Sequence, residues 1–443
     1  MTVQYADVIK YDGYPVETHQ VTTVDGYVLT ALRIPTGIKK KEAKKGPVLL
    51  LPGFLMTAAS WILVSAERSL PYMLAERGYD VWLATFRGNP LSSGHVKYTQ
   101  DDIKYWDFSY DDIGFYDIPA LIDHTLNTTG AASLSTILNL APAMYVMNVK
   151  GTLWRTLPIV FNQLKSLRQS VSERGSSGKL RGSDHMLKLL VHPFKVRDKI
   201  SLMVSPLMSE LGFEASKPNV TTYIKYTYLV KTCASVKMAI QIMDAGYVGK
   251  FSRFDYGGGK NKKLYGSEKP PFYNLGLVRV PSTLTVYSKT DRTTVAQDVK
   301  IFNSELPSGS KYRKSLYMVN APLFTHADFF LHDQVDKLVY NYVIDFLDKE
   351  DKLVASSSLP KRMSENKNNT KSKSTIEKAS SKYPRKKSEV TPRKASSKQV
   401  NKKSEITKGS PKGTKTVTYQ KDLRIFQCSG YDVLAVLGGC YSS

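Results

Sequence analysis

Asp291 and His326 are the residues whose types and spacing could together do acid–base chemistry. Asp291 follows an apolar run that ends at Tyr287, and open α/β sheets place their chemistry just past the carboxyl ends of parallel strands. His326 stands 35 residues later, after a second strand-like run, Ser315-Leu316-Tyr317-Met318-Val319. A carboxylate that orients a histidine base makes up two members of a serine-hydrolase triad. Taken singly, Asp291 also fits the role of a turn-forming aspartate, and His326 also fits that of a structural histidine with its hydrogen bonds made inside the fold.

Two further features bear on the same chemistry. Asp328 is a rival carboxylate, although its position suits capping or solvation of the helix that follows it. The sequence Leu51-Pro52-Gly53-Phe54 follows a strand-like run, and the glycine allows the backbone to turn tightly. The N–H of Phe54 could then stabilise an oxyanion.

The nucleophile of such a triad is missing from its expected place. No G-x-S-x-G pentapeptide occurs in the 443 residues. Ser133 and Ser135 follow a helix-like stretch but lack flanking glycines, so neither fits a sharp strand-to-helix turn. The Ser176-Ser177 pair has glycines beside it, but it stands in a basic loop with no preceding strand and is interpreted as a flexible turn.

The elements around these residues alternate between strand and helix, which predicts a mostly parallel sheet with crossover helices. Asp25-Gly26 between alternating apolar residues predicts a hairpin over residues 18–34. Short apolar runs predict strands, and periodic stretches predict helices. The expected strands are 48–51, 79–84, 280–287 and 315–319, and the expected helices are 60–77, 111–126 and 334–348. Within 111–126, Pro119 predicts that the regular helix starts at about that residue.

Composition divides the chain into three regions. Residues 1–350 are expected to form one domain, with its core in 1–140 and 270–350 and a helical cap inserted at about 145–268. Residues 351–424 form a Lys/Ser-rich tail with too few apolar side chains to fold, so disorder is expected. Residues 425–443 are apolar but too short to fold alone.

The formal charge of +24 comes from two segments. Residues 352–424 carry 17 Lys and 4 Arg against five acidic residues, and residues 150–199 carry 11 basic residues against three acidic ones. The tail has no RNA- or DNA-binding signature, so nucleic acid is not an expected partner. A solubilising tail is the first interpretation, and attachment to an acidic surface is the second. The basic cap segment fits a solvated surface, with contact to anionic lipid as the alternative.

Cys233, Cys428 and Cys440 are too scattered for a disulfide framework, and no pair has metal-ligand spacing. Neither a metal nor a cofactor is expected. No apolar run is long enough to span a membrane, and the first twenty residues lack a signal-peptide core.

The chain resembles the acid lipase family, which contains the gastric and lysosomal acid lipases. The resemblance rests on residues 13–37, 51–61, 74–126, 140–153, 270–291 and 324–330. It implies an α/β-hydrolase fold, lipid-ester substrates at a lipid–water interface, and a secreted or lysosomal location. It also implies that Asp291 and His326 form the charge relay and that Phe54 is an oxyanion donor.

The chain departs from the family pattern in two places. Pro52 replaces the histidine of the oxyanion loop and has no N–H of its own. The donor needed there is the N–H of Phe54, so function could survive. The strand, serine elbow and helix that the family places between the equivalents of Gly130 and Ala131 are absent. Loss of that central strand would leave two rows of backbone groups unpaired, each costing about 1–3 kcal/mol when buried. One rescue would be movement of residues 135–140 into the vacant row.

The sequence therefore predicts a lipase-like carboxylic ester hydrolase without its nucleophile, inactive as written. Three interpretations stay open. The chain is an incomplete form of an active lipid esterase, a non-catalytic homologue that binds lipid or a partner, or a product that does not fold.

Overall fold

The computed structural model describes most of the first 357 residues and one short segment near the carboxyl terminus. The described residues are 5–39, 42–53, 56–149, 179–181, 222, 225–226, 229–230, 233–357 and 422–428. Most of the basic cap segment 150–199, the Ser176-Ser177 pair and most of the predicted tail lie outside them. Residues 1–356 and 419–443 belong to one structural unit.

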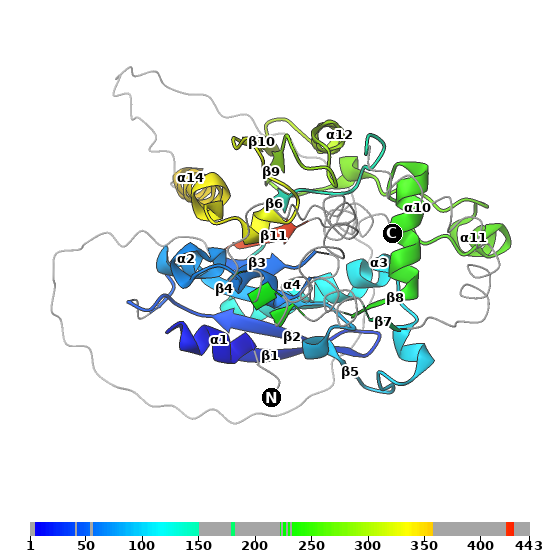
Figure 1. Ribbon diagram of the computed structural model, residues 1–443, viewed down its shortest axis with the longest axis horizontal. Helices are drawn as coiled ribbons and strands as arrows, with labels where there is room; N and C mark the ends of the chain where they lie inside the picture. Colours follow the sequence, from blue (N-terminus) through cyan, green and yellow to red (C-terminus); the bar gives the residue numbers. More distant parts are fainter. Residues whose placement is uncertain are drawn as a thin grey trace, which may run out of the picture. The chain divides into compact units, whose positions relative to one another are not determined.

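A single mixed sheet forms the centre of this unit (Figure 1). The strand order across the sheet is β1 (Glu17–Thr22), β2 (Tyr27–Ile34), β4 (Asp80–Thr85), β3 (Pro47–Leu51), β11 (Leu423–Cys428), β6 (Leu134–Leu140), β9 (Ser282–Ser288) and β10 (Arg313–Val319). The six strands from β4 to β10 in this order run parallel to one another, and β1 and β2 form an antiparallel hairpin at one edge. The short β5 (Gly94–His95) pairs with β2, and β7 (Lys179–Arg181) pairs with β8 (Cys233–Ser235) in a separate ribbon.

The predicted hairpin and strands are present. Gly26 turns the chain between β1 and β2 with φ of +99°, a conformation that glycine adopts without steric cost. Every residue of β3, β4 and β9 is buried, as expected for strands covered on both faces. The short apolar runs were therefore sufficient to locate the buried strands.

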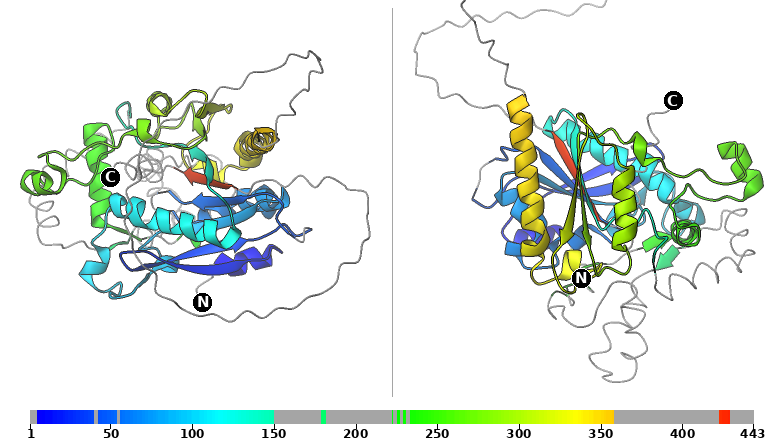
Figure 2. Two further views of the ribbon diagram at one scale, coloured as in Figure 1. Left: turned by 180° about the vertical axis from the view of Figure 1, so that it is seen from behind. Right: turned by 90° about the horizontal axis from the view of Figure 1, so that it is seen from above.

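Helices cover both faces of the sheet (Figure 2). Side chains of α2 (Leu70–Glu76) and α14 (Asn341–Ser357) pack in one apolar cluster with Leu50 and Leu138. Side chains of α4 (Ile118–Thr129), α10 (Val236–Val248) and α12 (Ala296–Glu305) pack in a second cluster with Leu49 and Ile137. Alternate residues of each strand enter opposite layers, as the pleat of a strand requires. The other α-helices within the described residues are α1 (Tyr5–Tyr11), α3 (Tyr110–Asp112), α11 (Gly258–Tyr265) and α13 (Asp328–Leu331).

The helix boundaries differ from the sequence predictions in two places. The stretch 60–77 contains two short 3₁₀ turns before α2 begins at Leu70. Over 111–126 the regular helix α4 begins at Ile118 with Pro119 in its first turn, as predicted, and a π-turn precedes it. The terminal helix continues to Ser357, so the boundary expected at residue 351 lies inside α14. Among the described helices, none is long and apolar enough to cross a membrane.

The prediction of a vacant central row was wrong. β11, from the far end of the chain, lies between β3 and β6 and pairs in parallel with both (Figure 1). β6 pairs with β11 and β9, so residues 135–140 have not moved next to β3. The backbone groups that the gap would have left unpaired on β3 and β6 are bonded to β11 instead. Residues 423–428, too short to fold alone, are stable as one strand of an existing sheet.

Candidate active site

Asp291 lies in the turn that follows β9, buried with 3% of its surface exposed. Its Oδ1 accepts hydrogen bonds from the backbone N–H groups of Thr293 at 2.8 Å and Thr294 at 2.9 Å. Its Oδ2 accepts a bond from the Thr294 hydroxyl at 2.6 Å. The turn thus holds the carboxylate in one orientation, with Oδ2 directed at the loop that carries His326.

His326 lies in the loop after β10, and its Nδ1 is 2.9 Å from Asp291 Oδ2. The ring is mostly buried, with 15% of its side chain exposed. Burial raises the pKa of Asp291, but the charge of His326 and the hydrogen bonds from His326 and Thr294 lower it, and the pKa lies below the ordinary value. A carboxylate that stays ionised beside Nδ1 fixes the ring so that Nε2 is the nitrogen available to a substrate or nucleophile.

Two hydroxyls join the aspartate loop to the histidine loop. Ser288 Oγ donates to the Phe324 carbonyl at 2.6 Å, and Thr290 Oγ1 donates to the same oxygen at 3.0 Å. The Phe324 N–H donates back to Thr290 Oγ1 at 2.8 Å. These bonds hold the residue two positions before His326 against the end of β9. The contact between Asp291 and His326 therefore does not depend on those two side chains alone.

Sequence reasoning identified the pair but missed Ser288, Thr290 and Thr294. The signal that could have revealed Thr294 is its place three residues after an aspartate, a spacing at which side chains and backbone N–H groups bond locally. The bonds of Ser288 and Thr290 span 36 and 34 residues and leave no local trace in the sequence.

Asp328, the rival carboxylate, bonds to Thr325, whereas Asp291 is the carboxylate bonded to the ring of His326. Its Oδ2 accepts bonds from the Thr325 N–H at 2.6 Å and the Thr325 hydroxyl at 2.9 Å. Asp328 is also the first residue of α13. Its negative charge therefore lies at the amino end of a helix, where the helix dipole favours it, and its hydrogen bonds go to the loop residue Thr325.

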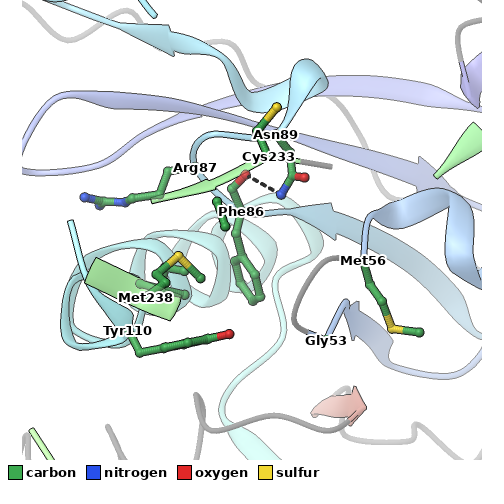
Figure 3. A pocket seen from close by; sticks show the side chains of 10 residues that line it. Gly53, Met56, Phe86, Arg87, Asn89, Tyr110, Cys233 and Met238 are labelled. Carbon is green, nitrogen blue, oxygen red and sulfur yellow. Dashed lines mark hydrogen bonds between the residues drawn. The ribbon is translucent and has the colours of Figure 1, made fainter. Parts of the chain in front are cut away.

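The loop expected to supply the oxyanion donor follows β3. The structure describes Pro52 and Gly53, and Phe54 lies outside the described residues. Gly53 lines a small pocket with Met56, Phe86 and seven other residues: Arg87, Asn89, Tyr110, Ile113, Cys233, Ala234 and Met238. In Figure 3 the ring of Phe86 lies between Met238 on one side and Gly53 and Met56 on the other. The pocket is therefore mostly apolar and borders the turn that leads to Phe54.

Two polar side chains of the pocket are held in place. Asn89 donates through Nδ2 to the Phe86 carbonyl at 3.2 Å, the dashed line in Figure 3. Arg87 is buried and bonds to Asp25 at 2.6 Å and to Asp117 at 2.7 Å. Its charge is thus matched by two carboxylates, so the guanidinium belongs to the wall of the pocket and not to its interior.

The serines considered as substitute nucleophiles lie at the wrong edge of the sheet. Ser133 Oγ bonds to Asp422 Oδ1 and Ser135 Oγ bonds to the Leu423 carbonyl, each at 3.3 Å. Asp422 and Leu423 mark the beginning of β11, whereas Asp291 and His326 follow the ends of strands parallel to it. These hydroxyls lie at the amino ends of the parallel strands, and His326 lies past the carboxyl ends, so the length of the strands separates them.

The sequence is similar to those of known lipases. Residues 5–65 match the family model described as a partial alpha/beta-hydrolase lipase region. Lipase 1 of Drosophila melanogaster is 32% identical over 374 residues, which cover 77% of this chain and 79% of that protein. Gastric triacylglycerol lipase of Homo sapiens is 29% identical over 377 residues, 80% of this chain and 92% of the human protein. Among solved structures, the esterase RhEst1 from Rhodococcus sp. ECU1013 is 13% identical, covers 75% of this chain and 98% of its own, and has a TM-score of 0.36.

The similarity to Lipase 1 extends over most of both chains, and the sheet, the helices on its two faces and the Asp–His pair past its carboxyl edge have the arrangement of an α/β-hydrolase. The chain belongs to the acid lipase family of α/β-hydrolases.

Proposed function

We propose that this protein hydrolyses carboxylic esters of lipids, with Asp291 and His326 as its charge relay. The observation that carries the proposal is the 2.9 Å hydrogen bond between His326 Nδ1 and the buried carboxylate of Asp291, which accepts three further hydrogen bonds from its own turn. Such a pair lets the histidine take a proton from an attacking hydroxyl and return it to the leaving alcohol.

The backbone N–H of Phe54 is proposed as an oxyanion donor. Gly53 precedes it at the end of β3, at the same edge of the sheet as the relay. A donor fixed there would stabilise the charge that develops on the ester carbonyl oxygen. The apolar pocket beside Gly53 suits part of an acyl chain, because moving methylene groups from water into an apolar lining is favourable. By its name, the human relative acts on triacylglycerol, which is therefore the first lipid substrate to test.

The test is turnover of a short-chain nitrophenyl ester and of emulsified triacylglycerol by the full chain and by His326→Ala. Loss of the base should lower kcat/KM by at least about 10³-fold. His332→Ala is a matched control, since His332 lies six residues further along the chain and its ring accepts a hydrogen bond from the Gln334 N–H at 3.0 Å, not from a residue of the relay. Equal activity of the wild type and His326→Ala would refute the proposed relay.

A second candidate is a non-catalytic homologue that binds lipid or a partner. The absence of the G-x-S-x-G pentapeptide favours it. It predicts a cooperatively folded protein with no ester turnover and no labelling by a fluorophosphonate probe. Retention on triacylglycerol emulsions without turnover would support this candidate over the first.

For the basic segment 352–424, we propose contact with an acidic surface. Its net charge of +16 would attract anionic lipid, an interaction that salt weakens. Co-sedimentation with phosphatidylserine vesicles at low and high ionic strength would test this. Binding that is independent of salt, or binding that persists when residues 358–418 are replaced by a neutral linker of equal length, would contradict it.

A further inference from the structure

Four large apolar side chains are exposed where α10 ends. We call them the apolar patch: Met147, Tyr247, Val248 and Phe272, each between 51% and 62% exposed. Single exposed apolar side chains are ordinary on a protein surface, whereas a contiguous group marks a surface that contacts a partner or a lipid. A role for these four therefore depends on whether they are neighbours.

Contacts around Gly249 hold the apolar patch together. The Met147 side chain lies over this glycine, since an added Cβ there would be 2.5 Å from its Cγ. The two members of the patch in α10 directly precede the same glycine. Lys250 follows it, and its Nζ lies 5.6 Å from the centre of the Phe272 ring. The four side chains thus surround one turn of the chain and form one group.

Basic residues predominate in the chain segment around the patch. Residues 247–279 contain seven Lys and Arg against two acidic residues, a net charge of +5. Three of these lysines, Lys260, Lys262 and Lys263, are exposed on α11, and Leu264 beside them is 54% exposed. Charge and an apolar side chain are therefore exposed together on this helix.

Arg253 connects α11 to the patch. Its guanidinium carbon lies 4.8 Å from the centre of the ring of Tyr265, the last residue of α11. Its backbone N–H donates to the carbonyl of Pro271, the residue before Phe272, at 3.0 Å. In Figure 1 α11 lies on the outer side of α10, the helix that ends at the patch. The lysines and the patch thus belong to connected parts of one surface.

The patch is attached to the edge of the sheet that carries the relay. Met147 lies seven residues after Leu140, where the chain leaves β6 at the carboxyl edge. The next residue, Asn148, donates to Asp298 through its N–H at 3.0 Å and through Nδ2 at 2.6 Å. Asp298 lies in the first turn of α12, the helix that follows the Asp291 turn. The patch and the relay are therefore anchored on neighbouring parts of the same edge.

We propose that the apolar patch and the α11 lysines dock this protein on a lipid-ester droplet whose surface carries fatty-acid anions. The inference rests on the proposed ester hydrolysis and names the surface through which the chain reaches its substrate. Exposed aromatic and aliphatic side chains enter the boundary between head groups and acyl chains, and lysines are attracted to anionic lipid. Hydrolysis of an ester releases a fatty acid, so the surface of the substrate becomes anionic as the reaction proceeds.

A lipid surface fits these residues better than a protein partner does. The exposed basic residues of α11 are all lysines. Protein–protein interfaces are depleted in lysine and enriched in arginine. Lysine is a compact, hydrated charge on a flexible stem, which suits a fluid anionic surface that has no fixed pattern of acceptors.

The first test is flotation of the full chain with triolein droplets coated with phosphatidylcholine, with and without added oleate. The patch variant carries Tyr247→Ser, Val248→Ser and Phe272→Ser. Its control carries Tyr11→Ser, Val96→Ser and Ile103→Ser, which change equally or more exposed apolar residues on other elements. We expect the patch variant to bind both kinds of droplet at least about tenfold more weakly than the wild type, and the control to bind like the wild type.

The second test separates the lysines from total charge. One variant carries Lys260→Gln, Lys262→Gln and Lys263→Gln, and its control, with the same loss of charge, carries Lys10→Gln, Lys97→Gln and Lys104→Gln. We expect the α11 variant to bind oleate-containing droplets at least about tenfold more weakly at low salt, with the difference lost at high salt. The basic segment 352–424 is present in every variant, so it cannot cause the difference.

The outcomes separate this inference from the proposed function. A wild type that does not float, or a patch variant that floats like its control, overturns the inference. Equal binding of the two lysine variants to oleate droplets overturns the choice of an anionic surface. Patch-dependent flotation without ester turnover leaves the docking surface standing and overturns the proposed hydrolysis. Equal melting temperatures confirm that the variants fold, and if a triple variant does not fold, Phe272→Ser against Ile103→Ser decides the question.

Discussion

At the scale of single residues, Asp291 is the side chain on which the orientation of His326 depends. Replacement by Asn keeps the size and the bonds from the backbone N–H groups of Thr293 and Thr294 but offers Nδ1 of His326 a neutral partner, which favours the wrong tautomer. We expect Asp291→Asn to lower kcat by about 10⁴-fold with little change in KM, measured on a nitrophenyl ester. Asp328→Asn is the matched control and should keep its kcat, since Asp328 bonds to Thr325.

The lowered pKa of Asp291 predicts how stability depends on pH. A carboxyl group whose folded-state pKa lies below the unfolded value of about 3.9 contributes stability above that value and loses it as the pH falls through the folded-state pKa. Urea unfolding of the wild type and Asp291→Asn should therefore show a difference in free energy of unfolding that is constant near neutral pH and narrows below about pH 4. A difference that widens in acid would show that the pKa shift has the opposite sign.

The contact between Asp291 and His326 could be predicted from the sequence because each residue follows a recognisable strand. The residues that support the relay could not. Thr290 is bonded to Phe324, 34 positions away, and only the parallel pairing of β9 with β10 brings the two loops together. The lack of flanking glycines already argued against Ser133 and Ser135 as nucleophiles. Their position at the opposite edge of the sheet became known only from the register of β6 with β11.

At the scale of elements, Gly46 tests whether β11 occupies its row in solution. A methyl group at Gly46 would meet the backbone of Asp422 and the Arg424 side chain, and overpacking of this kind costs about 1–3 kcal/mol. We expect Gly46→Ala to lower the free energy of unfolding by that amount in a urea titration. Gly259→Ala in α11 is the control, because its Cβ would meet nothing within 4 Å, and it should be neutral or slightly stabilising. Equal stability of Gly46→Ala and the wild type would argue that β11 does not lie beside Gly46.

Some strands could be predicted from their own residues, and one could not because its partners lie far away in the sequence. β3, β4 and β9 were predictable because each is a short apolar run that is buried on both faces. The partner of Leu423–Cys428 was not, since a six-residue strand carries no information about which row of a distant sheet it fills. The sequence predicted a vacant row after Gly130, and this prediction was wrong because the strand that fills the row comes from the opposite end of the chain.

At the scale of the whole molecule, the fold depends on both ends of the chain. Removal of residues 358–443 would leave the facing edges of β3 and β6 unpaired and expose the apolar layers that Leu423, Ile425 and Phe426 cover. Against a net stability of about 5–15 kcal/mol, this loss should abolish cooperative thermal unfolding. Adding a synthetic peptide of residues 419–443 should restore a cooperative transition, followed by circular dichroism. A truncated protein that melts like the full chain would show that the strand is dispensable.

The central claim, that the carboxyl-terminal segment is the middle strand of a lipase sheet, is tested most directly by hydrogen exchange. Amide exchange of the intact protein, followed by mass spectrometry, should show residues 423–428 protected to the same degree as β3 and β6, because their N–H groups are bonded within the same buried ladder. Exchange of residues 423–428 at the rate of an unstructured peptide, while β3 and β6 stay protected, would contradict the account.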